Sequence, residues 1–365
     1  MKQENIIYIN FMRVKIGKNI ISENHQTYFV ADVAANHDGS LSRAKKLIRL
    51  CAKAGANAAK FQHFKADTIV SDYGFKSVGK IAHQKKWKKS VYQLYKKASI
   101  NDTWTRDLKL ECKKNKIDFF TAPYDMDYVK SVYKYVAAYK IGSGDITWLD
   151  IIKEISKKGK PVLIATGASS INEVKQAVKT IKKFNKKIIL MQCNTNYTAN
   201  KDNTRYLNLY VLNQYRKIFN KSVILGLSDH TFGHNSVLGA VALGARVIEK
   251  HFTDDNLREG PDHKFSMNPK TWKQMVLETR VLEKSLGNGS KRVELNEKDS
   301  IVVQRRGIRA KEKLFKGYKI TEQMLTYLRP CPRGALNPYE KNKILGKILI
   351  KNIAKGDIIT CEKTK

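Results

Sequence analysis

The feature that most restricts the fold of this chain is a repeated pairing of a short apolar run with a segment whose apolar residues recur at helical spacing. The runs are short, rich in β-branched residues and nearly continuous in apolar side chains, as expected of parallel strands that are covered on both faces. They are Tyr28–Ala34, Ala58–Gln62, Asp118–Ala122, Ala138–Gly142, Pro161–Thr166, Ile188–Gln192, Val223–Leu227 and Val247–His251. Eight such units over roughly 250 residues predict a (β/α)8 TIM barrel. A doubly wound open sheet is the alternative, but no glycine-rich phosphate-binding motif follows the first run.

The segments between the runs contain the predicted helices. These are Leu41–Ala54, Thr103–Asn115, Met126–Tyr135, Trp148–Lys157, Ile171–Phe184, Arg205–Phe219, Ser236–Leu243 and Pro269–Leu286. A hairpin is expected around Gly17, before the first run. The connection over residues 64–100 is much longer than the others, polar and rich in lysine. We expect it to form a partly ordered loop over the barrel mouth, since connections beyond about 15 residues are usually functional lids or disordered.

A change of pattern after residue 286 marks a second domain. Gly287-Asn-Gly-Ser290 is a cluster of helix breakers, and a charged segment follows it. Short β-like pieces separated by glycine turns then begin, at Gly307–Ala310 and again near residues 319, 348 and 358. We therefore predict a barrel domain over residues 1–290, a linker over 291–303 and a small β-rich domain over 304–365.

Composition excludes some functions and leaves others open. No apolar run approaches the ~20 residues that span a bilayer, so we expect no membrane association. Five scattered cysteines without a CxxC pair, and a start without the layout of a signal peptide, favour a reducing cytoplasm. The net charge of +36 comes from lysines spread along the whole chain. We interpret them as solvated lysines on helix surfaces. A nucleic-acid-binding protein and the steering of anionic substrates are the alternatives.

Polar residues gather where the predicted strands end. Because the carboxyl ends of parallel barrel strands meet at one mouth, these side chains should lie close together there. In chain order, the set is Asp32; Lys60 and Gln62; Thr121 and Tyr124; Lys140, Ser143 and Asp145; Thr166; Gln192, Asn194, Thr195, Asn196 and Tyr197; Ser228, Asp229 and His230; Glu249, Lys250, His251 and Asp262.

Two of these residues, Lys60 and Lys140, are unusual in strands of a barrel core. A lysine is rarely buried unless an anion meets it, so the pair predicts a site for a small, highly charged anion such as one carrying a phosphate and a carboxylate. Lys140 is also a candidate Schiff-base lysine of an aldolase, since such an amine must be desolvated to act as a nucleophile.

His230 and His251 end the last two predicted strands, which are neighbours in a closed barrel. Neutral imidazoles with nearby carboxylates suit a divalent metal, and the absence of a cysteine close in sequence favours Mn²⁺ or Mg²⁺ over Zn²⁺. The alternative is that both are structural histidines held by hydrogen bonds.

Several stretches together resemble the N-acetylneuraminate (sialic acid) synthases and their nonulosonate-synthase relatives. They are Ala31-Asp-Val-Ala-Ala-Asn-His-Asp-Gly39, Lys60-Phe-Gln62, Tyr139-Lys-Ile-Gly-Ser-Gly-Asp145, Gly226-Leu-Ser-Asp-His-Thr231, Gly239-Ala-Val-Ala-Leu-Gly-Ala245, Ile248-Glu-Lys-His-Phe-Thr253 and Gly260-Pro-Asp-His263. Residues 306–365 resemble the family's antifreeze-like (SAF) domain, with Leu328-Arg-Pro330 as its marker.

The resemblance implies a transferase that adds phosphoenolpyruvate to the aldehyde of an N-acylated amino sugar, such as N-acetylmannosamine, and releases phosphate. It places the metal on His230 and His251. It places phosphoenolpyruvate near Lys60, Lys140, Ser143, Ser228 and Thr195 or Asn194, and the amino sugar near Gln62, Tyr197 and Asp262. Thr121 and Tyr124 are further candidates for substrate binding. Arg329 matches an arginine that the SAF domain delivers into the partner subunit's site, which implies a domain-swapped homodimer.

A carboxylate that orients or activates the attacking water completes the expected chemistry, and Asp32, Asp145 and Glu249 are the candidates. The family often has Glu at the positions of Asp32 and Asp145. Each shorter side chain reduces the reach of the carboxylate by one methylene. Either the bound sugar lies closer, or water fills the gap, or the substrate differs from the family's common sugar.

Overall fold

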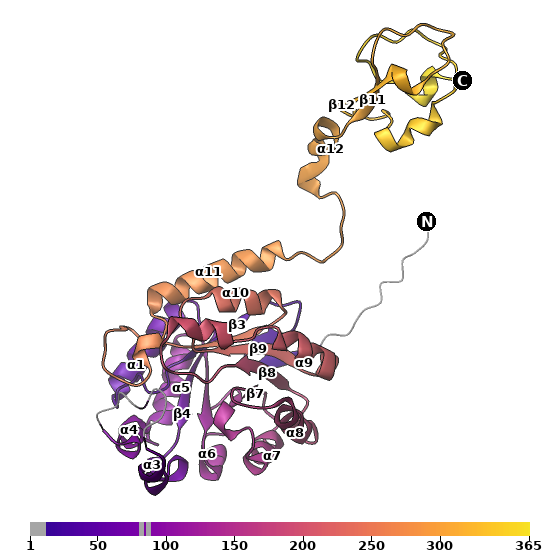
Figure 1. Ribbon diagram of the computed structural model, residues 1–365. Coiled ribbons are helices and arrows are strands. Elements are labelled where there is room, and N and C mark those ends of the chain that lie inside the picture. Colours follow the sequence, from indigo (N-terminus) through magenta and orange to yellow (C-terminus); the bar gives the residue numbers. More distant parts are fainter. Residues whose placement is uncertain (1–11, 80–83, 85–88) are drawn as a thin grey trace. The chain divides into compact units, whose positions relative to one another are not determined.

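The computed structural model describes residues 12–79, 84 and 89–365, and the chain divides after Gly287 into two compact units (Figure 1). The first unit is the predicted barrel: eight parallel strands close in chain order, with the last strand pairing with the first. The strands are β3 (Tyr28–Asp32), β4 (Ala58–His63), β5 (Asp118–Pro123), β6 (Tyr139–Ile141), β7 (Val162–Ala165), β8 (Ile188–Cys193), β9 (Ile224–Asp229) and β10 (Val247–His251).

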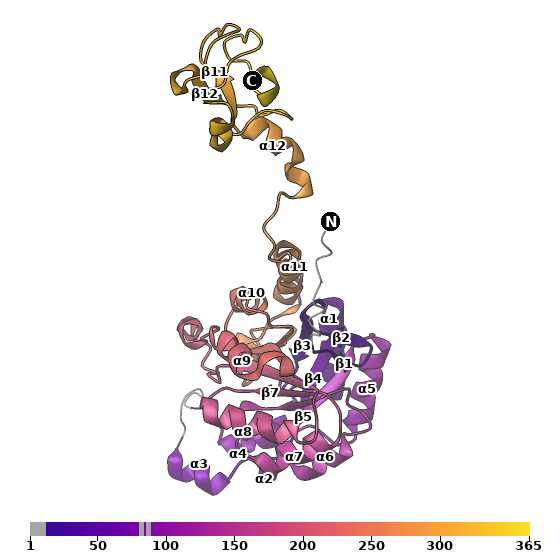
Figure 2. The same ribbon diagram turned by 90° about the vertical axis from the view of Figure 1, so that its right-hand side faces the viewer.

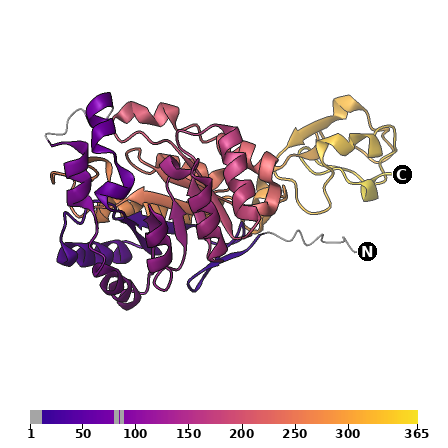
Figure 3. The same cartoon turned by 90° about the horizontal axis from the view of Figure 1, so that it is seen from below.

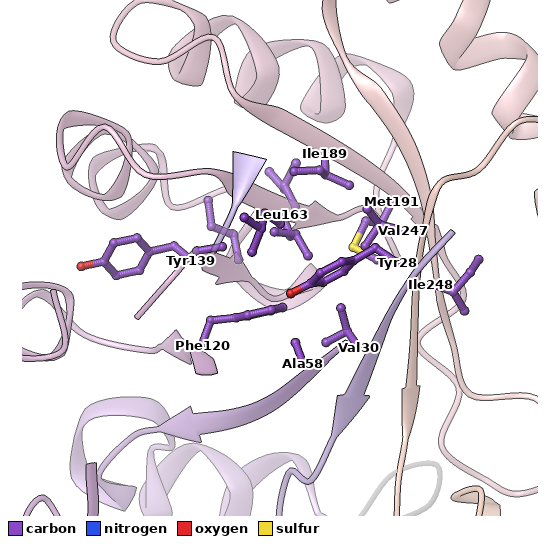
Figure 4. Close-up of a cluster of buried hydrophobic side chains, with 14 of the residues drawn as sticks. Tyr28, Val30, Ala58, Phe120, Tyr139, Leu163, Ile189, Met191, Val247 and Ile248 are labelled. Atoms are coloured by element: carbon purple, nitrogen blue, oxygen red, sulfur yellow. The ribbon is translucent and has the colours of Figure 1, made fainter. Parts of the chain in front are cut away.

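Alternating residues of these strands fill the barrel with apolar side chains. Figure 4 shows part of this interior, where Val30, Phe120, Leu163, Ile189 and Val247 point toward one another from different strands. Because side chains alternate between the two faces of a strand, the residues two and four positions further along also face inward. The polar residues at the carboxyl ends therefore divide into an inward set and an outward set.

In the described part of the barrel unit, eight of the helices surround the strands (Figures 2 and 3). Each of them has buried apolar residues. They are α1 (Leu41–Lys53), α5 (Trp104–Lys114), α6 (Met126–Ser131), α7 (Leu149–Lys157), α8 (Ile171–Lys182), α9 (Val211–Phe219), α10 (Asn235–Ala242) and α11 (Pro269–Ser285). In α1 the buried residues are Ala44, Leu47, Ile48 and Cys51, spaced as one helix face requires, and the Ser40 side chain caps the first turn.

Some predicted boundaries were too wide. The helix expected over 126–135 ends at Ser131, and the one expected over 205–219 is a 3-10 turn over Lys201–Tyr206 followed by α9.

A short hairpin lies at the amino ends of the barrel strands. It consists of β1 (Val14–Ile16) and β2 (Asn19–Ile21), and Gly17 adopts a φ of +55° in its turn, which confirms the predicted hairpin. The Asn19 side chain and the Tyr28 hydroxyl both donate to Asp118 Oδ2, at 3.0 and 2.8 Å. These contacts fix the hairpin to the end of the barrel opposite the predicted site.

The described part of the insertion over residues 64–100 contains three helices, so the expectation of a loop was wrong. Its expected place at the barrel mouth is confirmed, because Leu94 and Tyr95 share a cavity with Gln62 and His251. The helices are α2 (Ala66–Ile69), α3 (Asp72–Val78) and α4 (Val91–Ala98). A capping box between Ser90 and Gln93 begins α4. Residues 80–83 and 85–88 lie outside the described residues.

The second unit is a small β-rich domain with its own core. Its named strands β11 (Gly307–Ala310) and β12 (Leu325–Leu328) pair antiparallel. Isolated bridges, such as Leu314 with Ile353, tie further segments together. Helix α12 (Lys298–Gln304) lies in the segment that we predicted to be a linker. The buried core residues are Ile308, Ala310, Leu314, Ile320, Leu325, Leu336, Ile344, Leu349, Ile353 and Ile359. In the described parts of both units, no helix is long and apolar enough to cross a membrane.

Candidate active site

Four charged side chains form a buried cluster inside the carboxyl end of the barrel. Strand pairing places Asp32 opposite Lys60 and Ser228 opposite Glu249. Lys60 Nζ lies 2.7 Å from Asp32 Oδ2 and 3.5 Å from Glu249 Oε1, and Lys140 Nζ lies 2.7 Å from the same Glu249 oxygen. All four side chains are at most 4% exposed. The structure thus brings together the two predicted lysines and two of the three predicted carboxylates.

Opposite charges in this cluster counteract the cost of burial at Glu249 and Lys60, whereas at Asp32 burial prevails and raises the pKa. Burial alone would raise the pKa of Glu249, but the ammonium groups of Lys140 and Lys60 outweigh it and lower the pKa to about 2. Burial likewise opposes the charge of Lys60, yet Asp32 and Glu249 raise its pKa. Two ammonium and two carboxylate groups leave no net formal charge. Each ammonium still carries three N–H groups, more than these carboxylates use, so both lysines can also donate to an entering anion.

Asp229 and Lys250 belong to the other face of the same strands. Lys250 Nζ lies 2.6 Å from Asp229 Oδ2 and donates to the Thr231 carbonyl at 2.7 Å. The Ser236 hydroxyl, at the start of α10, also donates to this carboxylate at 2.5 Å. These two charged residues therefore hold the barrel to its helix layer and do not face the mouth.

The two histidines lie side by side above the charged cluster, with ring centroids 5.3 Å apart. Burial lowers the pKa of His230 to about 3, and His251 contributes in the same direction. Burial, followed by the charge of Lys60, lowers the pKa of His251 to about 3. Both rings are neutral at physiological pH. His230 Nδ1 lies 2.9 Å from the carbonyl oxygen of Asn194, which can only accept, so this nitrogen carries the proton and Nε2 keeps its lone pair.

This pair fits part of a metal site. A carbonyl that fixes the tautomer of an imidazole is the usual support of a metal-ligating histidine. His251 Nδ1 is buried without a hydrogen-bond partner, and the nearest carboxylate oxygen, from Asp262, is 3.7 Å away. Within the described residues, no three His, Cys, Asp or Glu side chains are arranged to hold an ion. The two imidazoles therefore suit an ion whose remaining positions are filled by water or substrate oxygens.

A cavity of about 180 Å³ opens beside His251 at the barrel mouth. Its lining includes Gln62, Tyr197 and Asp262, which were predicted to lie near the sugar, and Tyr124, a further candidate for substrate binding. The insertion contributes further lining residues from α2 and α4. The complete lining is Ala35, Gln62, Phe64, Ile69, Leu94, Tyr95, Ala98, Tyr124, Tyr197, His251, Pro261 and Asp262.

Two carboxyl groups near this cavity have raised pKa values. Burial raises the pKa of Asp262 to about 7, although its Oδ2 accepts from the Ala35 amide at 3.3 Å. Burial raises the pKa of Asp145 to about 6. A side chain at Gly142 would stand 3.3 Å from the Tyr124 hydroxyl and 3.6 Å from Asp145 Oδ2, so glycine there leaves room for both groups. Carboxyls that titrate near neutrality can exchange protons with a substrate.

Ser143 and Thr195 approach each other around Gly167. The Gly167 amide donates to Ser143 Oγ at 2.9 Å, and a Cβ added to this glycine would stand only 2.6 Å from the Thr195 methyl group. Ser228 Oγ donates to Glu249 Oε1 at 3.1 Å. The predicted hydroxyl donors thus come from three different strand ends around the charged cluster.

The prediction that Thr121 lies in the substrate site was wrong. Thr121 is fully buried on the outer face of β5, where its hydroxyl donates to the Phe61 carbonyl and contacts His63, each at 2.8 Å. The next residue, Ala122, is on the face of the strand that points into the barrel. Placing Thr121 in the site was an error of one position, and in a strand such an error reverses the face.

Arg329 lies in the second unit, directly after β12, and is exposed. The carbonyl of the following Pro330 accepts from Arg309 Nη2 at 2.7 Å, which fixes this turn to its own unit. Its predicted role in a partner subunit stays a prediction.

The sequence reasoning missed three residues that surround the histidines or the cavity. Cys193 ends β8 opposite Ser228, and its Sγ is 3.9 Å from His230 Nδ1. Phe265 packs against both imidazoles, with centroids 6.0 and 5.0 Å away. Tyr95, on α4, packs on Phe64 at 5.5 Å. Cys193 could have been found from the alternation of Ile189, Met191 and Cys193 along one strand face, and Tyr95 from its helical spacing with Val91 and Leu94.

Comparison with known proteins extends over both units. The NeuB family model matches residues 47–291, and the SAF domain model matches residues 305–363. An uncharacterized protein of Methanocaldococcus jannaschii is 35% identical over 349 residues, which cover 95% of this chain and 97% of that protein. The N,N'-diacetyllegionaminic acid synthase of Campylobacter jejuni is 34% identical over 338 residues, which cover 92% of this chain and 99% of that enzyme.

Solved structures agree with this similarity. The N-acetylneuraminic acid (sialic acid) synthetase of Leptospira borgpetersenii, solved in complex with citrate, matches with a TM-score of 0.69 and 29% sequence identity. The match covers 80% of this chain and 95% of that chain.

Proposed function

This chain belongs to the NeuB family, and we propose that it joins phosphoenolpyruvate to an N-acyl amino sugar to form a nonulosonic acid, with release of phosphate. The observation that carries the proposal is the pair of buried lysines, Lys60 and Lys140, next to the neutral His230 and His251. The lysines would bind the charged anion, and the histidines would hold the metal that polarises the aldehyde beside it. The cavity beside His251 supports the proposal, because it could hold the second substrate.

In the proposed reaction, the π pair of the enol forms the new bond to the aldehyde carbon. The carbonyl pair moves to the aldehyde oxygen, which takes up a proton. Water then adds to the second carbon of the former enol and loses one proton. As phosphate leaves with the electron pair of its carbon–oxygen bond, the remaining hydroxyl forms the ketone and gives up its proton. The balance is phosphoenolpyruvate, sugar and water in, and nonulosonic acid and phosphate out.

The residues of the chain have distinct tasks in this scheme. Lys60 and Lys140 bind the phosphate and carboxylate of phosphoenolpyruvate as compact charges, and Ser143, Ser228 and Thr195 donate hydroxyls to the same anion. Asp145 orients the water, and its raised pKa lets it accept a proton near neutral pH. Asp262, with Gln62 and Tyr197, hydrogen-bonds the sugar.

We infer that a divalent metal, with Mn²⁺ the first choice and Mg²⁺ the second, is held by His230 and His251. It would supply Lewis-acid polarisation of the aldehyde oxygen. The charge of the lysine cluster supports this inference. Since Asp32 and Glu249 already neutralise Lys60 and Lys140, a second source of positive charge is needed to bind a highly charged anion tightly.

The alternative Schiff-base aldolase is less well supported. A lysine nucleophile must be free to attack a carbonyl carbon, but Lys140 Nζ is engaged in an ion pair with the buried Glu249 at 2.7 Å.

We further propose a domain-swapped homodimer in which Arg329 enters the site of the partner subunit. The exposure of Arg329 supports this role. The five unpaired cysteines support a cytoplasmic location.

The test is phosphate release from phosphoenolpyruvate with Mn²⁺ and a panel of N-acyl hexosamines, with product masses recorded. His251→Ala should lower turnover by at least ~100-fold and weaken Mn²⁺ binding measured by calorimetry. Lys270→Met, at an exposed position on α11, is the control and should leave both unchanged. Absence of phosphate release with every sugar would refute the proposal. Borohydride trapping of pyruvate on Lys140, with activity that survives EDTA, would establish the aldolase instead.

A further inference from the structure

One buried histidine ties together two loops that follow neighbouring barrel strands. Strand β10 pairs with β3, and His263 lies in the loop after β10. It is fully buried, although residues 257–260 of the same loop are exposed. Its Nε2 lies 3.0 Å from Oδ1 of Asp38, in the loop after β3, and its Nδ1 lies 2.8 Å from the Thr253 hydroxyl. We call Asp38 and His263 the linking pair.

The hydrogen bonds of His263 determine where its proton lies. A carboxylate oxygen can only accept, so Nε2 carries the proton in the contact with Asp38. Burial lowers the pKa of His263, so the ring is neutral and Nδ1 accepts from the Thr253 hydroxyl. The Asp255 carbonyl is farther from this hydroxyl, at 3.1 Å. Both ring nitrogens are therefore engaged within the two loops, and neither is available to a metal or a substrate.

The backbone around the linking pair is shaped to accommodate it. Asp38 has a φ of +51°, in the sparsely populated left-handed region. A Cβ added to Gly260 would stand 2.6 Å from His263 Cδ2, so glycine there makes room for the ring. Arg43 Nε and Arg258 Nε lie 3.0 and 3.1 Å from Asp38 Oδ2 and hold the other carboxylate oxygen. Such a conformation persists only where the surrounding contacts determine it, and such positions are common at functional sites.

Asp262 is the site residue that lies next to the linking pair, because it directly precedes His263. Its Oδ2 accepts from the Ala35 amide, in the loop after β3, at 3.3 Å and lies 3.7 Å from His251 Nδ1. Both contacts are long, so they hold the carboxyl group weakly. The Ser266 hydroxyl donates to the Asp262 carbonyl at 2.6 Å and fixes the backbone after it. The place of this carboxyl group therefore depends on how the two loops are held together.

We propose that Asp38 and His263 are positioning residues that hold the Asp262 carboxyl group beside His251. This inference rests on the proposed function, in which Asp262 binds the sugar. Misplacement of a binding group by about 1 Å can cost about 100-fold in rate. Loss of the linking pair should therefore raise the KM for the sugar by roughly 10- to 100-fold. The KM for phosphoenolpyruvate should stay within about twofold, because the lysines proposed to bind that anion are held by ion pairs of their own.

The experiment measures the KM for the sugar and the KM for phosphoenolpyruvate separately, and the melting temperature, for four variants. His263→Phe keeps a flat ring but removes both hydrogen bonds, and Asp38→Ala removes the acceptor. Asp38→Asn keeps an acceptor oxygen for the imidazole and tolerates a positive φ, so it should restore most of the sugar KM that Asp38→Ala loses. Glu259→Gln, at an exposed position of the same loop, is the control and should change neither KM.

A double-mutant cycle shows whether the linking pair acts through Asp262. In an Asp262→Asn background, His263→Phe should change the sugar KM by less than about twofold, because the group that it positions is already altered. A full effect in that background would overturn the inference, since His263 would then act by another route. A lower melting temperature with an unchanged sugar KM would also overturn it, because the pair would then only stabilise the fold.

Either of these two results would leave the proposed function in place. Absence of phosphate release by the unaltered protein with every sugar would overturn the proposed function and this inference with it.

Discussion

Replacement of Lys250 by methionine tests the division of the strand-end residues into two faces. Lys250 is 1% exposed, and its Nζ contacts only the outer side of the barrel, at Asp229 Oδ2 and the Thr231 carbonyl. Methionine matches the volume of the lysine stem but removes the charge. Asp229, 2% exposed, would then be buried with hydroxyl and amide donors alone.

The expected loss is about 3–5 kcal/mol in the free energy of unfolding, the usual cost of breaking a buried ion pair by removing one partner. Tryptophan fluorescence during urea titration reports the unfolding of the barrel unit, because all four tryptophans of the chain precede residue 288. The double variant Lys250→Met/Asp229→Asn removes both charges and should recover more than half of the loss. Lys270→Met, an exposed control, should change stability by less than about 0.5 kcal/mol.

The same variants distinguish a structural from a catalytic role. At temperatures where Lys250→Met remains folded, its KM for phosphoenolpyruvate should stay within about threefold of the original, since the proposed anion site at Lys60 and Lys140 lies on the other strand face. A variant with unchanged urea stability but greatly weakened phosphoenolpyruvate use would refute the assignment of faces. The assignment of the strand-end residues to an inward and an outward face would then be wrong.

Three further predictions concern the site and the thiols. Arg329→Ala and His251→Ala should each be nearly inactive alone, and co-expression should restore part of the activity, because the mixed dimer has one site with both residues intact; no restoration would contradict the cross-subunit role. Gly167→Ala should raise the KM for phosphoenolpyruvate and cost about 1–3 kcal/mol in unfolding free energy, because the new Cβ would stand 2.6 Å from the Thr195 methyl group; unchanged kinetics would show that this contact relaxes freely. At pH 8 a thiol reagent should modify Cys361 first, since the other four thiols are buried and burial raises the pKa of three of them, which suppresses the reactive thiolate; rapid loss of all five would contradict the burial.

Much of the architecture could be predicted from local patterns. The eight strands were found because each is a short apolar run that needs cover on both faces, as β8 shows with six consecutive buried residues. The hairpin at Gly17 was found because its turn needs a positive φ. The helices of the insertion were missed, although Val91, Leu94, Tyr95 and Ala98 have helical spacing, because lysines dominate the composition around them.

The sequence predicted which residues gather at the barrel mouth better than it predicted which of them contact one another. His230, His251, Lys60 and Lys140 meet as expected, because the ends of parallel strands converge in any closed barrel. The ion pairs of both lysines were not foreseen. They depend on Glu249 lying within reach of Lys140 across the barrel, and two residues 109 positions apart have no local pattern that links them.

The sequence by itself determined the order of a barrel followed by a small β-rich unit. It also determined that basic, acidic and imidazole groups lie at one mouth of the barrel. Only the tertiary structure decided which of those groups face one another. It turned Thr121, Asp229 and Lys250 outward and Glu249 inward, and it placed α4 along the cavity beside His251. The physical reason is that hydrophobicity is a property of each residue, whereas the phase of a strand and the partners of a buried charge are set by pairing between distant segments.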